Sequence, residues 1–183
     1  MSKKLPAVLC AVVPTVVLAL AAPVAAQAAG NTFLKSDALT GESVQVDHAG
    51  EIEVGDWSLE ASRAGGRVTV NELRLSKSVD TSSTQLFSYL TSGAAIPSAK
   101  ILMLKQTGAA RPEVYYRLCM TGVRVTSIST KGGEDGHVSE DVTLSFATVV
   151  ESYRRQNPDG SLAPAVFAGW DLINRLQYGD PTC

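Results

Sequence analysis

Histidines are the side chains of this 183-residue chain best suited to acid–base chemistry, and it has two, His48 and His137. A hydrolase needs a nucleophile beside a base that a third group orients. Neither histidine lies near the Gly-x-Ser-x-Gly turn that presents such a nucleophile, and both occupy polar segments. We therefore expect solvated loop histidines, no catalytic residue and no enzyme activity.

Metal ligands and cofactor motifs are equally sparse. The sequence contains no Cys-x-x-Cys and no His-x-x-x-His. Residues 132–135 (GGED) lack the Lys-Ser/Thr of a phosphate loop and the alternating acids of a calcium loop, which favours a plain acidic turn. The carboxylate pairs Asp56/Glu60 and Glu140/Asp141 are expected on exposed strand faces. The sequence thus predicts neither a metal site nor a cofactor.

Two cysteines, Cys119 and Cys183, would be able to pair in an oxidising compartment. Cys119 falls on the polar parity of an alternating segment, so its side chain is expected to point away from the core. Cys183 is the last residue, where chains are usually mobile. A disulfide within the chain, a link between subunits and two free thiols all stay open.

The N-terminus has the pattern of an export signal. Two lysines precede an apolar run over residues 5–22, and Ala26-Gln27-Ala28 matches the small-x-small motif of a signal peptidase site. We expect cleavage between Ala28 and Ala29. The alternative is an uncleaved anchor, because the run approaches the ~20 residues that span a bilayer. Two prolines and the alanine-rich composition favour cleavage.

Cleavage would divide the chain into a signal peptide, residues 1–28, and one domain, residues 29–183. A domain of that length buries about two-thirds of its unfolded surface. The full chain has a formal net charge of −2, and the removed segment would take two lysines and no acid with it. This balance, without runs of Lys or Arg, argues against a nucleic-acid partner. No membrane partner is expected after cleavage.

The element that organises this domain is a long strand predicted over residues 139–153. Apolar side chains from Val142 to Val150 alternate with more polar ones, so one face is buried. Strands usually run about 5–6 residues, and a long one tends to be shared between a sheet and the curved wall of a barrel.

Three other segments reverse their apolar parity midway, with Gly55 and Gly122 at two of the reversals. They are residues 51–60, 67–76 and 113–127. A bulge at each reversal would keep the apolar side chains inward and bend the strand, as in a closed barrel. The alternative is two short strands meeting at a turn in each segment. No Pro or Asn-Gly pair marks such a turn, which favours bends.

One helix is predicted, over residues 82–90, capped by Asp80 or Thr81 and stopped by Gly93. Its apolar stripe is Leu86, Phe87 and Leu90. Residues 99–105 are apolar on both faces, so this strand should be covered on both sides, with the helix as its natural cover. Further strands are predicted at residues 32–35 and 166–172, and polar connections at residues 36–50, 130–138 and 154–163.

A set of short motifs in this order resembles the haemolysin-coregulated protein (Hcp) family, whose members form the inner tube of bacterial type VI secretion systems. The resemblance runs from Phe33 to about Asn174 and depends on order and spacing rather than on any single motif. The matching residues are Phe33-Leu34-Lys35, Asp37, Gly41-Glu42-Ser43, His48, Glu51-Ile52-Glu53-Val54, Trp57-Ser58, Lys77, Val79-Asp80, residues 127–130 and 132–135, Glu140, Val142, Leu144, Phe146, Ala147, Tyr153 and Gly169-Trp170-Asp171-Leu172.

The resemblance implies a mainly β fold: a single-domain β-barrel of two curved sheets with one flanking α-helix. It also implies a non-enzymatic subunit that forms homo-hexameric rings, stacked into a tube that carries a spike protein and small effector proteins. In the family the loop that corresponds to residues 36–50 helps rings contact one another. The residues carried over to that loop are Asp37, Gly41, Glu42, Ser43 and His48.

The export signal distinguishes two hypotheses, because tube subunits reach their assembly site from the cytoplasm. In the first, the chain is a tube subunit with an unusual N-terminus. In the second, it is an exported protein of the Hcp fold that works as a periplasmic or extracellular binding or structural module outside a type VI tube.

Overall fold

The longest strand, β8 (Glu113–Gly132), belongs to both main sheets. The computed structural model describes residues 31–180 and 182–183. The predicted signal peptide and its cleavage site at Ala28/Ala29 lie outside the described residues. The other elements are β1 (Thr32–Lys35), β2 (Ile52–Glu53), β3 (Trp57–Ser58), β4 (Ala61–Ala64), β5 (Arg67–Val70), β6 (Leu73–Ser78), α1 (Thr81–Ser92), β7 (Ile96–Lys105), β9 (Val138–Ser145), β10 (Thr148–Tyr153), β11 (Val166–Asp171) and β12 (Leu176–Tyr178).

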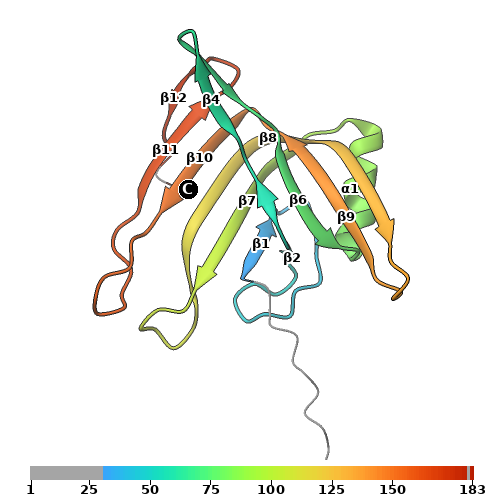
Figure 1. Ribbon diagram of the computed structural model, residues 1–183, viewed down its shortest axis with the longest axis horizontal. Helices are drawn as coiled ribbons and strands as arrows, with labels where there is room; N and C mark the ends of the chain where they lie inside the picture. The colour runs from blue at the N-terminus through green and yellow to red at the C-terminus, as the bar shows by residue number, and fades with distance from the viewer. Residues whose placement is uncertain (1–30, 181) are drawn as a thin grey trace, which may run out of the picture.

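Two antiparallel sheets share β8 and curve into a barrel. Sheet A has the order β12-β11-β10-β8-β7-β1-β2, and sheet B the order β3-β6-β9-β8. The N-terminal half of β8 pairs with β10 and its C-terminal half with β9, so consecutive strands lie in different sheets. Figure 1 shows the two sheets diverging, with α1 at the side of sheet B. The predicted mainly β fold of two curved sheets with one helix is confirmed.

The bend predicted for residues 113–127 is confirmed. Gly122 has φ +60°, and β8 continues through it without ending. Met120 before the bend and Val123 after it both lie in the core, although their parity differs. Glycine adopts this left-handed conformation at little cost, which allows one long strand to serve two sheets.

The bend prediction is wrong for the other two segments, where two short strands replace one bent strand. Within residues 51–60, β2 lies in sheet A and β3 in sheet B. Within residues 67–76, β5 belongs to a separate hairpin and β6 to sheet B. The parity reverses because the chain leaves one sheet and enters another.

The organising strand is likewise divided, at Phe146 and Ala147, into β9 and β10. Phe146 lies in the core, and the next residue in the core is Val149. Val150, which was predicted to share the apolar face of Val142, lies on the other side of sheet A. The backbone N–H of Ala147 donates to the carbonyl oxygen of Thr121, beside the bend of β8. An extra residue is therefore inserted opposite that bend, which reverses the parity of the second half.

Helix α1 is longer than predicted, but its cap and stop are as expected. The Asp80 carboxylate accepts from the backbone N–H of Ser82, and Gly93 ends the helix at φ +66°. Leu86 is buried in the core, whereas Phe87 is exposed, so the predicted apolar stripe is wrong at that residue. The helix packs against β8 and not chiefly against β7, because the C-terminal half of β8 curves toward it.

Strand β7 is buried on both faces, as predicted, although α1 is not its cover. Ile101 faces the core, and Leu102 faces the opposite side of sheet A. Leu102 pairs in register with Phe33 of β1, which stacks on the ring of His48 with centroids 4.7 Å apart. The loop of residues 36–50 therefore covers this face.

Two elements of the structure have no counterpart in the prediction. One is β4, which pairs with β5 in a hairpin that projects beyond the barrel in Figure 1. The other is β12, the outermost strand of sheet A. Among residues 31–180 and 182–183, no helix has the length and apolar character needed to cross a membrane.

Candidate functional site

The buried histidine is a correction to the sequence interpretation. His48 is not solvated: its Nδ1 lies 2.8 Å from Oε2 of Glu51, and its ring stacks on Phe33. Lys35 binds the other oxygen of the same carboxylate at 3.0 Å. Among the described residues, no serine, threonine or cysteine side chain is hydrogen-bonded to the His48 ring. The arrangement holds a loop in place and lacks a nucleophile.

The loop residues singled out in the sequence are drawn mainly inward. Ser43 and His48 are buried, and Gly41 lies so close to β2 that an added Cβ would be 2.4 Å from the carbonyl oxygen of Glu51. Asp37 lies at the start of the loop and is exposed. The solvent-facing apolar side chains of the loop are Val44 and Val46, which are 91% and 62% exposed.

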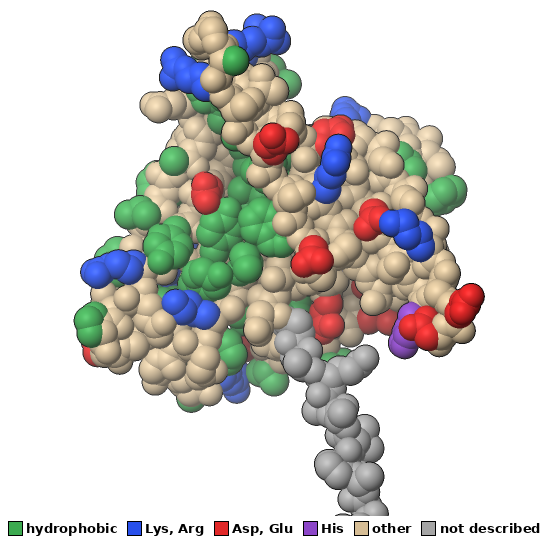
Figure 2. All heavy atoms as spheres, in the orientation of Figure 1, with side chains coloured by type: hydrophobic (Ala, Val, Ile, Leu, Met, Phe, Trp, Pro, Cys, Tyr) green, Lys and Arg blue, Asp and Glu red, His purple; other side chains and the backbone are tan. Residues whose placement is uncertain are grey.

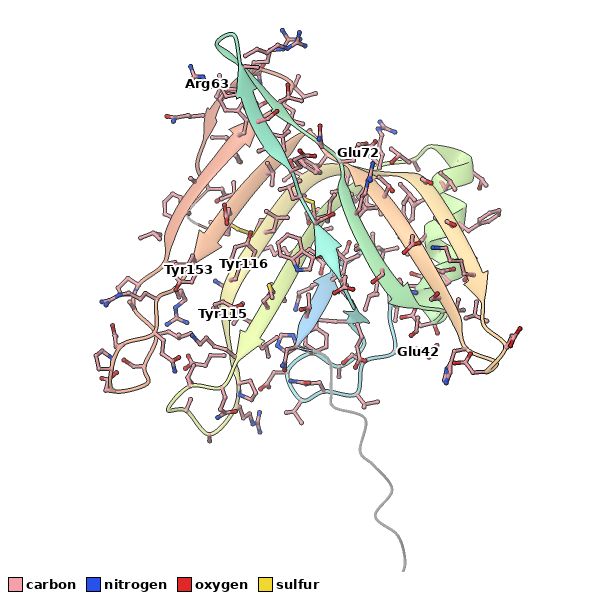
Figure 3. The ribbon with its side chains drawn as sticks, viewed as in Figure 1. Glu42, Arg63, Glu72, Tyr115, Tyr116 and Tyr153 are labelled. Carbon is pink, nitrogen blue, oxygen red and sulfur yellow. A yellow bond between two sulfur atoms is a disulfide. The ribbon has the colours of Figure 1, made fainter. Side chains whose placement is uncertain are left out.

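Glu42 joins the loop to the N-terminus of α1. Its carboxylate accepts from the backbone N–H of Thr81 at 2.9 Å and from the hydroxyl of the same residue. The backbone N–H of Thr40 donates to Oε1 of Gln85 at 2.9 Å. A carboxylate is favoured at a helix N-terminus by the helix dipole. Figure 3 shows Glu42 at the lower edge of the barrel, below the hairpin.

The carboxylate of Glu140 is also buried, contrary to the expectation of an exposed strand face. Its Oε2 lies 3.4 Å from Nζ of Lys77 and accepts from the Ser83 hydroxyl at 2.8 Å. Its neighbour Asp141 is exposed, as predicted, and pairs with Lys131 at the surface. This buried network joins β6, β9 and α1, and it has the character of a structural ion pair.

Cys119 and Cys183 are joined in a disulfide with Cα atoms 5.8 Å apart. The sequence expectation of a mobile Cys183 is wrong, because its side chain is buried at 9% exposure. Its Sγ lies 3.5 Å from the carbonyl oxygen of Val150 in β10. Cys119 lies outside the hydrophobic core, as its parity predicted.

The surface has open hollows lined by both polar and apolar side chains. Two of them, of about 480 and 430 Å³, lie side by side and share Ser58 and Arg74. The first is lined by Ser58, Glu60, Val70, Asn71, Glu72 and Arg74. No group of His, Cys, Asp and Glu side chains suited to a metal ion occurs within the described part of the chain. Nothing in these linings pairs a nucleophile with a base.

The β4–β5 hairpin is largely exposed and has little support from the rest of the subunit. All four residues of β4 are exposed, and β5 packs against the core only through Val70. Its turn is Gly65-Gly66, with both φ angles positive, which is typical of a tight two-residue hairpin loop. The Gly-Gly pair between Val68 and Ser62 was the sequence signal that could have predicted it.

Apolar side chains gather beside this hairpin. Figure 2 shows them as a continuous green area between the hairpin and the strands of sheet A. Trp57 and Tyr116, which are only partly buried, stack there with ring centroids 5.7 Å apart. Burial and the nearby Glu151 carboxylate raise the pKa of the Tyr116 hydroxyl, so this tyrosine stays neutral. The surface is suited to contact with another protein rather than to catalysis.

Comparison with known proteins gives a consistent result. Residues 33–153 match the family model described as "Type VI secretion system effector, Hcp". Over 158 residues the chain is 35% identical to Protein hcp1 of Pseudomonas aeruginosa strain PAO1, covering 79% of this chain and 96% of that protein.

Solved structures agree with the sequence relationship. Hcp1 from Salmonella typhimurium superposes with a TM-score of 0.69 at 30% identity, covering 80% of this chain and 97% of that one. Hcp2 from the same organism gives 0.63 at 28% identity, with coverages of 79% and 98%. A structure described as a type six secretion system protein gives 0.75 at 24% identity, with coverages of 82% and 100%, which supports the fold alone.

Proposed function

The chain belongs to the Hcp family of type VI secretion system proteins, and from that membership we propose that it is a structural subunit that assembles with its own copies. The assembly is a homo-hexameric ring, and rings stack into a tube. The subunit performs no chemistry of its own. Beside the family membership, the projecting β4–β5 hairpin is the structural observation that supports self-association.

An isolated two-stranded hairpin is at best marginally stable in water. The β4–β5 hairpin has an ordered four-pair register from Ala61↔Val70 to Ala64↔Arg67, yet Val70 alone packs against the core. A second copy of the chain that packs along it would supply the missing support. The partly exposed Trp57 and Tyr116 beside it extend the same contact surface.

Charge favours a head-to-tail arrangement of copies. The tip of the hairpin carries Arg63 and Arg67, and Figure 3 shows Arg63 at that end. The β8–β9 turn carries Glu134 and Asp135, both exposed, and lies at the opposite end of the molecule in Figure 1. A basic tip that meets an acidic turn of the next copy gives a heterologous contact, which stacks subunits in one direction.

Light scattering of the purified chain tests the assembly. We expect a species of about six times the subunit mass, or multiples of it, that persists on dilution. Arg63→Glu combined with Arg67→Glu should leave the circular dichroism spectrum unchanged and reduce the larger species. Arg155→Glu, an exposed arginine in the connection between β10 and β11 whose side chain bonds only Asn157, is the matched control and should assemble normally. A strict monomer at high concentration would refute the proposal.

Partners beyond the chain itself are a spike protein at the end of the tube and small effector proteins inside the ring. The two hollows that share Ser58 and Arg74 offer hydroxyl and charged groups to such a cargo, and the second adds the apolar side chains of Trp57, Leu75 and Val142. Co-purification of effectors with the assembled ring, and their loss when the ring is dissociated by the arginine substitutions, tests this part.

The route out of the cell is a separate part of the proposal. Residues 1–28 act as a signal peptide that is cleaved before Ala29, and residues 29–183 form the domain. The Cys119–Cys183 disulfide supports export to an oxidising compartment. N-terminal sequencing of the released protein should give Ala29 as its first residue. Recovery of Met1 would refute the proposed cleavage.

Deletion of the type VI apparatus in the source cell separates the two hypotheses. A tube subunit loses its release into the medium. A chain that works outside the tube keeps its release, and its Hcp fold would then serve as a binding or structural module.

A further inference from the structure

The last residues of the chain do not trail away from sheet A but cross back over it. We define the C-terminal strap as Asp180, Thr182 and Cys183. It comes after β12, the outermost strand of the sheet, yet Cys183 reaches β8, which lies three strands inward. On the way Sγ of Cys183 lies 3.5 Å from the Val150 carbonyl oxygen in β10. Figure 1 places the end of the chain over this part of the sheet.

Among Asp180, Thr182 and Cys183, the described residues of the strap, the contacts to the sheet other than the disulfide are few and weak. Arg117 donates from Nη1 to the carbonyl oxygen of Cys183 at 3.4 Å, which is a long hydrogen bond. Lys100 lies near enough to Asp180 to help lower the pKa of that carboxyl, after the hydrogen bonds from Thr182. The bonds from Thr182 to Asp180 stay within the strap and do not attach it to the sheet.

Of the described contacts between the strap and sheet A, the disulfide is the strongest. Chain ends are poorly ordered unless something ties them down. Here the tie joins an edge of sheet A to its most central strand, and it buries the Cys183 side chain against β10. Strand β12 pairs only with β11, over Gly169↔Tyr178 to Asp171↔Leu176. The attachment of β12 to the rest of the sheet thus also depends on the strap.

We propose that the Cys119–Cys183 disulfide is a redox latch that closes the C-terminal strap and β12 over the outer face of sheet A. Closing removes two protons and two electrons from the two thiols, and a disulfide of the surroundings accepts them and becomes two thiols. In reverse, an external dithiol reduces the bond and is itself oxidised to a disulfide. The latch does not depend on the proposed ring assembly.

The latch makes the exposure of the outer edge of sheet A depend on whether the compartment is reducing or oxidising. In a reducing cytoplasm the strap is free and the outer edge of sheet A, at β11 and β12, is open to pairing with other chains. In an oxidising compartment the same edge is fixed. Release also frees the Val150 carbonyl oxygen from its contact with Sγ of Cys183 and leaves Cys119 as a free thiol.

Peptide-resolved amide hydrogen exchange of the full chain tests the latch. In the oxidised protein, Leu176–Tyr178 and the strap are protected; after reduction with dithiothreitol their exchange accelerates by at least about tenfold. The amides of β7 and β8 keep most of their protection. Oxidised glutathione, added after removal of the reductant, restores the slow exchange.

Variants identify the bond responsible. Cys183→Ser and Cys119→Ser should each show fast strap exchange that reductant no longer changes. Cys10→Ser, made in the uncleaved full chain, is the matched control, since it removes the third cysteine and should behave as the uncleaved parent chain. Peptide mapping without reduction should recover the Cys119–Cys183 pair.

Three outcomes would overturn the inference. One is a strap that stays protected in Cys183→Ser, because the remaining contacts would then suffice. Another is loss of amide protection in the core together with the strap, because the disulfide would then stabilise the whole barrel and not the strap alone. The third is a different cysteine pairing in the oxidised chain.

Discussion

Lys77 and Glu140 face each other directly across β6 and β9, and their side chains are 0% and 6% exposed. Nζ of Lys77 also lies 2.8 Å from Oδ1 of Asp80, the cap of α1, and 3.0 Å from the hydroxyl of Ser83. One buried cation thus orients two strands and the first turn of the helix. A charge in such a position is tolerated only when it is paired and hydrogen-bonded.

Glu140→Ala should therefore destabilise the fold strongly. It removes the strand partner of the buried Lys77 but leaves Asp80 at 2.8 Å, so the loss of unfolding free energy should approach, without reaching, the roughly 3–5 kcal/mol that a fully unpaired buried charge costs. Denaturant unfolding followed by circular dichroism measures the loss. Asp141→Ala on the same strand is the control: it breaks the exposed pair with Lys131, which contributes about 1 kcal/mol or less. Equal losses for the two variants would contradict the assigned role of the buried pair.

The Lys77–Glu140 pair was readable in part from the sequence. Lys77 alternates in step with Leu73 and Leu75 and so lies on their buried face of β6. Glu140 lies two residues before Val142 and so shares its buried face of β9. Two opposite charges on buried parities predict partners, but only the register of β6 with β9 identifies them. The Glu140 carboxylate was assigned to the surface because charged residues are rarely buried unpaired.

Local signals predicted the helix and the bend at Gly122, since both depend on nearby residues. Asp80 and Gly93 mark the ends of α1 whatever it packs against. The burial of His48, a loop residue, instead depends on Phe33 in strand β1. The position of Cys183 depends on Cys119 in the same way. Contacts of this kind have no periodicity for a single sequence to display.

The bend of β8 should be sensitive to any side chain at Gly122. Its φ of +60° costs a non-glycine residue about 1–2 kcal/mol. An added Cβ would also lie 3.0 Å from the Cβ of Ala147, at the junction of β9 and β10. We expect Gly122→Ala to lower the denaturation midpoint accordingly. Gly132→Ala is the control, because its Cβ would meet nothing within 4 Å and its φ is not positive. A Gly122→Ala protein as stable as Gly132→Ala would refute the bend's dependence on glycine.

Glu42→Ala should loosen the loop of residues 36–50 without unfolding the barrel. The substitution removes both acceptor contacts with Thr81 and a carboxylate at the helix N-terminus, which contributes about 0.3–1 kcal/mol. Hydrogen exchange of the loop should accelerate while that of β7 does not. If the loop contacts a neighbouring ring, light scattering should also show weaker association. Unchanged exchange in the loop would show that Gln85 and His48 hold it alone.

Acid should open the turn after β11 before the barrel unfolds. The pKa of the Asp171 carboxyl is lowered by hydrogen bonds from the backbone and side chain of Asn174, and by one from the backbone N–H of Ile173. A lowered pKa in the folded state means that the turn is stabilised at pH values above the unfolded pKa of 3.8. That contribution is lost as pH falls through the lower folded value, because the protonated carboxyl is a poorer acceptor.

A carbon-detected titration of Asp171 should give a midpoint below 3.8, with the amide of Ile173 shifting in the same step. Asp171→Asn should abolish the pH response of that amide, whereas Asp37→Asn, in another loop, should preserve it. A midpoint at or above the unfolded value would mean that the carboxylate does not organise this turn.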